Sequence, residues 1–250
     1  MSLHQTRRLN GKVALVTGAS SGIGAAASRA LAAEGARLAI AARRVQRLAE
    51  LAGEIHEAGG EALVIETDVT DEAQATAMVT KAIQHFGRLD ILLANAGVGV
   101  AAPFQNTTTE EYRRMLDVNV LGALYPIYAT LPAMKRQGEG HIAIISSGTG
   151  RYIHPSTVYS GTKHAVSAIA ESLRREIGRH GIRVTCIEPG AVRTEFTARM
   201  RDDVRRSVER RLGDMEQLES EDIAAAIVYA VTQPPRVNVS ILTIYPTQQA

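Results

Sequence analysis

The sequence is poor in cysteine and in aromatic residues, and it carries almost no net charge. Its one cysteine, Cys186, lies in an apolar run, so no disulfide can form within one chain and a buried, unreactive thiol is expected. The 28 basic and 26 acidic residues leave a net charge of +2, which gives no indication of a nucleic-acid partner. No run of about 18 apolar residues is present, and Met1–Asn10 lacks the apolar core of a secretory signal. We therefore expect a cytoplasmic protein that binds neither nucleic acid nor membrane.

Short β-branched runs alternate with longer Ala- and Leu-rich stretches of helical spacing along the 250 residues. Near-continuous apolar strands that alternate with helices predict a single α/β domain, in which a doubly wound parallel sheet has helices on both faces. We expect seven strands, at Lys12–Thr17, Arg37–Ala41, Ala62–Glu66, Ile91–Ala94, His141–Ser146, Arg183–Ile187 and Ser240–Ile244. The expected helices are Gly22–Glu34, Val45–Ala58, Asp71–Phe86, Thr109–Gln137, Thr157–Arg179 and Glu221–Thr232.

A glycine-rich turn follows the first expected strand, between that strand and a helix. Glycines let the backbone approach a diphosphate closely, and the start of the helix directs free N–H groups and a positive dipole end at the anion. This position is the context that a dinucleotide-binding motif requires, so a Rossmann fold is predicted. The expected cofactor ligands of the turn are Gly18, Ser20, Ser21, Gly22, Ile23 and Gly24.

The end of the second expected strand bears on the choice between NAD(H) and NADP(H). An acidic side chain there would accept hydrogen bonds from the ribose hydroxyls and repel a 2′-phosphate. The sequence instead has Ala42, followed by Arg43 and Arg44. Because a guanidinium fork suits a phosphate, we predict NADP(H), with Arg43 as the main ligand and Arg44 assisting. The alternative is that both arginines are merely solvated at the start of a helix.

Tyr159 and Lys163 lie four residues apart on an expected helix, and therefore on one face of it. A phenol titrates near pH 10, and a nearby cation lowers that value, so the pair makes a sensible proton donor and acceptor. The pair follows a strand that ends in Ser146-Ser147, which favours this interpretation over an exposed helical pair. The seven histidines are scattered without zinc-type spacing, so no metal site is predicted.

Taken together and in this order, the motifs resemble those of the short-chain dehydrogenase/reductase family, from Gly11 to about Pro246. The glycine turn is similar to the family's T-G-x-x-x-G-x-G. The resemblance implies one large Rossmann domain and further cofactor contacts near the adenine, the central sheet and the nicotinamide amide. The residues so implied are Asp68, Val69, Asn95, Ala96, Gly97, Pro189, Gly190, Val192 and Thr194.

The resemblance also implies hydride transfer between the nicotinamide and an alcohol/carbonyl pair. Tyr159 would be the general acid/base and Lys163 would fix the ribose, while Asn119 would hold a water that links the lysine to solvent; a plain polar helix residue is the alternative for Asn119. A serine that binds the substrate oxygen is expected, and two compete for the role. Strand register selects Ser147, whereas the usual spacing to the tyrosine selects Ser146; we prefer Ser147 because loops absorb deletions more readily than strands.

The substrate is expected among the loop after Gly97, the stretch Gly148–Val158 and the segment 191–213, which is either a lid or a solvated helix face. Apolar residues there suit an aldehyde or ketone, while an arginine could bind a carboxylate or face solvent. The residues concerned are Val98, Val100, Phe104, Tyr152, Phe196 and Met200, with Arg151, Arg193 and Arg199. His154 either lines this pocket or is a surface loop histidine, and the surface loop is preferred. The run Pro235–Thr247 resembles the subgroup of 3-hydroxy acid dehydrogenases and clavulanate-type aldehyde reductases.

The stretches Thr109–Gln137 and Thr157–Arg179 resemble the helices that pair between subunits in this family, which implies a homotetramer, with a dimer as the next choice. Two other functions remain open on the same scaffold. Epimerases and dehydratases usually have an added substrate region, which this chain lacks. Cofactor-sensing binding proteins tend to lose the tyrosine or the lysine, and both are present here.

Overall fold

The computed structural model describes residues 7–153, 156–198 and 200–249. Within these residues the strands form one parallel sheet in the order β3-β2-β1-β4-β5-β6-β7. The strands are β1 Val13–Thr17, β2 Arg37–Ala42, β3 Ala62–Glu66, β4 Ile91–Ala94, β5 Gly140–Ile145, β6 Ile182–Pro189 and β7 Ile241–Ile244. The strand order reverses between β1 and β4, and this is the crevice where a doubly wound sheet binds ligands. The predicted seven-stranded Rossmann fold is confirmed.

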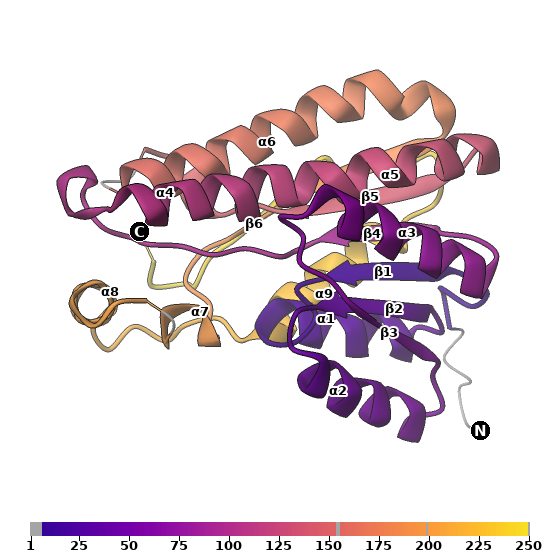
Figure 1. Cartoon of the computed structure of the whole chain (residues 1–250), viewed down its shortest axis with the longest axis horizontal. Coiled ribbons are helices and arrows are strands. Elements are labelled where there is room, and N and C mark those ends of the chain that lie inside the picture. The colour runs from indigo at the N-terminus through magenta and orange to yellow at the C-terminus, as the bar shows by residue number, and fades with distance from the viewer. Residues whose placement is uncertain (1–6, 154–155, 199, 250) are drawn as a thin grey trace.

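Helices cover both faces of the sheet because neighbouring residues of each buried strand point in opposite directions. Ala14 and Val16 of β1 join one apolar core, whereas Val13 and Leu15 join the other. Figure 1 shows α1, α2 and α9 beneath the sheet and α3, α5 and α6 above it. The helices are α1 Gly22–Ala33, α2 Val45–Glu57, α3 Glu72–Phe86, α4 Thr109–Leu116, α5 Gly122–Gln137, α6 Thr157–Ile177, α7 Glu195–Ala198, α8 Asp202–Leu212 and α9 Ser220–Val231.

One expected helix is interrupted. The sequence predicts a single helix over Thr109–Gln137, but α4 and α5 are separated by a π-helical turn at Asp117–Leu121. Such a turn adds a residue to one helical turn and often marks a functional site. It brings the side chain of Asn119 into the interior, where 2% of the residue is exposed.

The segment between β6 and α9 carries α7 and α8, which lie beside the main layers rather than on either face of the sheet (Figure 1). A small core of its own holds this segment against the loop after β4. Ala102 packs there with Val204 and Val208 of α8. A single β-bridge between Val192 and Leu218 closes its base. We call the described residues 191–198 and 200–218 the lid segment.

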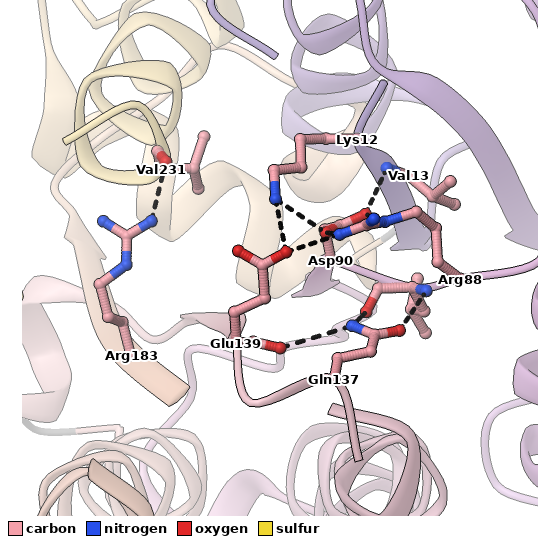
Figure 2. Close-up of polar contacts among 9 residues, drawn as sticks. Lys12, Val13, Arg88, Asp90, Gln137, Glu139, Arg183 and Val231 are labelled. Carbon is pink, nitrogen blue, oxygen red and sulfur yellow. Dashed lines mark hydrogen bonds and ion pairs between the residues drawn. The ribbon is translucent and has the colours of Figure 1, made fainter. Parts of the chain in front are cut away.

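An ionic cluster fastens the amino-terminal ends of the central strands, at the edge of the sheet away from the crevice (Figure 2). Asp90 accepts hydrogen bonds from the Val13 N–H at 2.9 Å and from Arg88 Nε at 2.8 Å. Glu139, just before β5, accepts from Lys12 Nζ at 2.8 Å and from Arg88 at 2.6 Å. Burial by itself would raise the pKa of Asp90, but the hydrogen bonds from Arg88 and Val13 and the charge of Lys12 hold it below its ordinary value. The cluster thus ties together the starts of β1, β4 and β5.

The described helices include none with the length and apolarity needed to span a membrane. Likewise, His, Cys, Asp and Glu side chains form no metal-binding group of three or more within the described residues.

Candidate active site

A cavity of about 830 Å³ opens at the carboxyl ends of the strands, between the sheet and the lid segment. Of the sequence-predicted cofactor and catalytic residues, all line it except Gly24 and Asn119. Phe104 and Tyr152 were expected near the substrate, but both are exposed and neither lines the cavity. The lid segment contributes Phe196, Met200, Val208 and Leu212 to the wall. Of the two interpretations that the sequence left open for this segment, its place in the cavity wall favours a lid over a solvated helix face.

The glycine turn has the conformation and the packing that its sequence suggests. Gly18 and Gly22 have φ angles of +66° and +53°, a region that favours glycine. Gly24 does not line the cavity; a Cβ at this position would lie 2.5 Å from Asn95 Nδ2 and 2.5 Å from the Gly18 carbonyl oxygen. Gly24 therefore permits close packing beneath the turn rather than contact with a ligand.

The turn after β4 is locked to β1 by a network centred on Thr17. The Thr17 hydroxyl accepts hydrogen bonds from the backbone N–H groups of Asn95 at 3.0 Å and Ala96 at 3.1 Å. Asn95 Nδ2 donates to the Thr17 carbonyl at 2.8 Å. This arrangement fixes the Asn95-Ala96-Gly97 turn against the glycine turn across the centre of the crevice.

Arg43 and Arg44 have different surroundings. The Arg43 side chain is 59% exposed, and its nearest acidic group is Asp68 at 3.6 Å. Arg44 folds back over the glycine turn and donates to the Ser20 carbonyl at 3.1 Å and the Ser21 hydroxyl at 2.7 Å. It also reaches Glu195 of the lid segment at 2.9 Å. Arg43 is thus the more available of the two for a phosphate.

Tyr159 and Lys163 face the cavity from the first turns of α6. The Lys163 side chain is buried, its Nζ donates to the Ile145 carbonyl at 3.0 Å, and it lies 5.9 Å from the centre of the Tyr159 ring. Burial lowers the pKa of Lys163 to about 8. Burial also raises the pKa of Tyr159 to about 12, against a lowering contribution from the Ser147 hydroxyl. The sequence argument expected the lysine to lower the phenol's pKa, and it was wrong for this structure because burial dominates.

Ser146 and Ser147 point to different places. The Ser146 hydroxyl donates to the Lys163 carbonyl at 3.0 Å and contacts the Ser167 hydroxyl at 2.8 Å, so it is committed to α6. Ser147 instead interacts with Tyr159, and its Oγ accepts from the Thr149 N–H at 3.2 Å. The geometry favours Ser147 for contact with a substrate, in agreement with the strand register.

Asn119 joins the loop after β4 to the helix that carries Tyr159. Its Oδ1 accepts from the Val98 N–H at 2.8 Å, and its Nδ2 donates to the Val98 carbonyl at 2.9 Å and to Thr162 Oγ1 at 3.0 Å. Both amide protons are therefore used by protein partners. The water-holding role stays a prediction, and the role visible in the geometry is to position the neighbouring loop.

The arginines expected near the substrate have partners within the chain. Arg151 donates to Glu188 at 2.7 Å, and Arg193 lies 3.4 Å from Glu219. Neither arginine lines the cavity, so neither is placed to bind a substrate carboxylate in this arrangement. His154 and Arg199 lie outside the described residues.

Several contacts at the site were not found from the sequence. Phe196 lies against Tyr159 with ring centres 5.9 Å apart, and a Cβ at Gly99 would be 2.4 Å from the Phe196 ring. Arg201 donates to both oxygens of Glu111 at 2.7 Å and thereby joins the lid segment to α4. The glycine pattern Gly97-Val98-Gly99 was the only local signal for the first contact, and the second has none.

A family model described as short chain dehydrogenase matches residues 12–205. An uncharacterized oxidoreductase of Staphylococcus epidermidis is 39% identical over 236 residues, which cover 94% of this chain and 97% of that protein. Glycine betaine reductase ATRR of Emericella nidulans is 39% identical over 96% of this chain, and the match spans only 19% of that longer protein.

Solved structures are similar over nearly the whole chain. The closed form of serine dehydrogenase complexed with NADP+ superposes with a TM-score of 0.88 at 31% identity, covering 95% of this chain and 96% of that one. An alcohol dehydrogenase from the archaeon Thermococcus sibiricus, complexed with 5-hydroxy-NADP, has a TM-score of 0.86 at 31% identity and covers 96% of this chain and 98% of its own.

Proposed function

Because the chain belongs to the short-chain dehydrogenase/reductase family, we propose that it is an NADP(H)-dependent oxidoreductase in which Tyr159 is the general acid/base. Its reaction would interconvert an alcohol and a carbonyl, on a small aldehyde, ketone or 3-hydroxy acid. One observation carries this proposal: Tyr159, Ser147 and Lys163 share the wall of the cavity that also contains the glycine turn. The phenol, the hydroxyl and the ammonium thus converge beside a dinucleotide-type crevice.

The residues of the crevice fit the proposed cofactor. The start of α1 and the glycine turn offer backbone N–H groups to a diphosphate, and Arg43 offers an exposed guanidinium to a 2′-phosphate. No acidic side chain occupies position 42, where one would repel that phosphate. Two structural relatives are described with NADP+ or an NADP derivative, which supports the same choice. NADP(H), when bound, supplies or accepts the hydride.

Three side chains of this protein handle the proton that the carbonyl oxygen takes up. With its pKa raised to about 12, Tyr159 is a neutral phenol near neutral pH, and it can donate a proton to the carbonyl oxygen as the hydride reaches the carbon. Ser147 donates a hydrogen bond to the same oxygen, where negative charge develops. Lys163, held by the Ile145 carbonyl, supplies a cation next to the phenol and would stabilise the phenolate that remains.

Apolar side chains form part of the cavity wall: Phe196 lies against the Tyr159 ring, and Met115, Val118 and Met200 also line the cavity. Such a wall suits the carbon body of an aldehyde or ketone and keeps water away from the reacting atoms. The likeness to the serine dehydrogenase supports a 3-hydroxy acid as the alternative within the same reaction class.

A homotetramer is part of the same proposal. Three large apolar side chains, Leu116, Leu121 and Tyr128, are exposed along the outer face of α4, the π-helical turn and α5. Contact between copies of the chain would cover these side chains.

The test is to incubate the protein with NADPH and a panel of aldehydes, ketones and 3-oxo acids while the absorbance of the reduced nicotinamide is followed. Turnover is expected with at least one carbonyl, and Tyr159→Phe should lower it by about 10²–10⁴-fold with little change in NADPH binding. Tyr229→Phe, which alters an exposed phenol on α9, is the matched control. Full activity of Tyr159→Phe would refute the proposed role of the phenol.

A further inference from the structure

Two segments that border the proposed reaction continue past the point where β5 and β6 pair with each other, although β6 still pairs with β7 through Pro189. The β5–β6 ladder ends at Ile145 and Ile187, with one more hydrogen bond from the Ser146 N–H to the Ile187 carbonyl at 2.7 Å. Ser147 and Pro189-Gly190 both follow that point. On the proposed function, the first contacts the substrate oxygen and the second the nicotinamide, so their spacing sets the distance that the hydride crosses.

Glu188 joins these segments from a buried position. It directly precedes Pro189, and 1% of the residue is exposed. Its Oε2 accepts from Arg151 Nε at 2.7 Å and from Thr243 Oγ1 at 2.9 Å, while Oε1 accepts from Ser167 at 3.4 Å. A buried carboxylate is tolerated when it is paired and hydrogen-bonded in this way.

Arg151 ends a tight loop that begins at Ser147. The Gly150 N–H donates to the Ser147 carbonyl at 2.8 Å, and Thr149 accepts at its carbonyl from the Ser160 hydroxyl at 2.8 Å. A Cβ at Gly150 would lie 2.5 Å from Ser146 Oγ. Because the loop is packed this closely, we expect a displacement of Arg151 to displace Ser147 as well.

Tyr245 fills the space between the same two segments. A Cβ at Gly148 would lie 2.4 Å from the Tyr245 hydroxyl, and a Cβ at Gly190 would lie 2.6 Å from Tyr245 Cδ1. The Gly190 N–H donates to the Ile244 carbonyl at 2.7 Å, which holds the second segment to β7. The phenol ring therefore acts as a spacer, with one end on each segment.

We propose that Arg151, Glu188, Thr243 and Tyr245 form a brace that sets the position of Ser147 relative to Pro189-Gly190. The four are positioning residues for hydride transfer, and this inference rests on the proposed function. The ion pair draws the segments together, and the Tyr245 ring keeps them apart. Loss of either side should change the spacing at the reacting atoms, where a displacement of about 1 Å costs on the order of 10²-fold in rate.

The chain contains a closely matched control. The Arg151 and Glu188 side chains are 37% and 2% exposed, and those of Arg88 and Asp90 are 36% and 5% exposed. The second pair, drawn in Figure 2, lies just before β4, whereas Glu188 lies near the end of β6. Glu188→Gln and Asp90→Asn therefore remove the same charge from similar environments, and only the first touches the brace.

The rate experiment is a single turnover of saturating NADPH with the most active carbonyl of the panel, followed by absorbance. Glu188→Gln should slow hydride transfer by about 10- to 100-fold with NADPH affinity changed by less than about 2-fold, whereas Asp90→Asn should keep the wild-type rate. Arg151→Gln should slow it similarly, and the double variant should be no slower than either single one. Tyr245→Leu should also slow it. Equal rates in Glu188→Gln and Asp90→Asn, or losses that multiply in the double variant, would overturn the brace.

A second measurement needs no turnover. In hydrogen–deuterium exchange of the intact protein, Glu188→Gln should accelerate exchange in residues 147–151 and 189–191, and Asp90→Asn should leave both segments unchanged. Unchanged exchange in Glu188→Gln would refute the brace. If the wild-type protein reduces no carbonyl of the panel, the proposed function fails, and the exchange result still decides whether the brace exists.

Discussion

Lys163 is predicted to make the folded protein less stable near neutral pH than a variant without its charge. Its side chain is buried, with 5% of the residue exposed, and burial lowers its pKa from 10.5 to about 8. Lys163→Met keeps a side chain of similar reach and removes the ammonium. The variant also removes the hydrogen bond to the Ile145 carbonyl, which is worth about 1–3 kcal/mol if that oxygen stays unpaired.

The direction and the size of this effect on the free energy of unfolding follow from the difference between the folded and unfolded pKa of Lys163. Between pH 8 and pH 10.5 the unfolded chain binds more protons at this lysine than the folded chain does, so the free energy of unfolding rises with pH. At about 1.4 kcal/mol for each pKa unit, the fall from 10.5 to about 8 corresponds to a penalty on the order of 3 kcal/mol well below pH 8. The penalty disappears above pH 10.5. The lost hydrogen bond is independent of pH, so the slope with pH separates the two effects.

The assay is urea unfolding of the cofactor-free wild type and Lys163→Met from about pH 7 to about pH 10. Over this range the wild type should gain on the order of 2–3 kcal/mol relative to the variant. Lys135→Met, which changes an exposed lysine on α5, should give a difference that stays flat with pH. Parallel curves for wild type and Lys163→Met would show that the buried ammonium carries no such penalty.

Two further predictions concern the cofactor crevice. Ala42→Asp with Arg43→Gln should weaken NADPH binding by about 10- to 150-fold, the equivalent of one charge-assisted hydrogen bond of about 1.5–3 kcal/mol, and should strengthen NADH binding; unchanged NADPH affinity in fluorescence titrations would contradict the role of Arg43. Gly24→Ala should lower the free energy of unfolding by about 1–3 kcal/mol, because its Cβ would lie 2.5 Å from the Gly18 carbonyl oxygen. Gly53→Ala in α2, where the Cβ meets nothing within 4 Å, is its control and should leave stability equal or higher; similar denaturation midpoints for the two variants would refute the packing argument.

The fold could be predicted from the sequence because its strands are short apolar runs separated by helical periodicity. The interruption of the helix over Thr109–Gln137 could not be predicted, because one added residue per turn hardly alters an apolar pattern over 29 residues. Tertiary contacts stabilise the interruption, because Asn119 hydrogen-bonds Val98 and Thr162, which are distant in sequence. Local propensity carries no trace of such partners.

Sequence motifs predicted which residues line the crevice, but they did not predict the pKa shifts and ion pairs there. A pairwise argument from Tyr159 and Lys163 gave the wrong direction for the phenol, because it counted a neighbouring charge and ignored burial. Arg151 and Arg193 were open candidates for a substrate carboxylate, but they lie against Glu188 and Glu219 and do not line the cavity. Each glutamate lies more than 20 residues from its arginine in the chain, and the burial of Tyr159 is likewise a property of the fold, so local sequence reveals neither.

Asp90 and Lys163 are buried charges at opposite ends of the strands, and they differ in their partners: the partners of Asp90 serve stability, and the isolation of Lys163 serves the proposed chemistry. At the amino-terminal edge Lys12 and Arg88 neutralise Asp90 and Glu139, and the pKa of Asp90 is lowered, so its carboxylate stabilises the folded protein above its ordinary pKa and that stabilisation is lost as the pH falls. Near the carboxyl ends of the strands, Lys163 forms no ion pair with a carboxylate of the described residues, and its ammonium donates a hydrogen bond to the Ile145 carbonyl. A carboxylate beside Lys163 would remove the penalty and would also neutralise the cation that a developing phenolate needs. The change with pH in the stability difference between wild type and Lys163→Met therefore measures the free energy that burying this cation costs the folded protein.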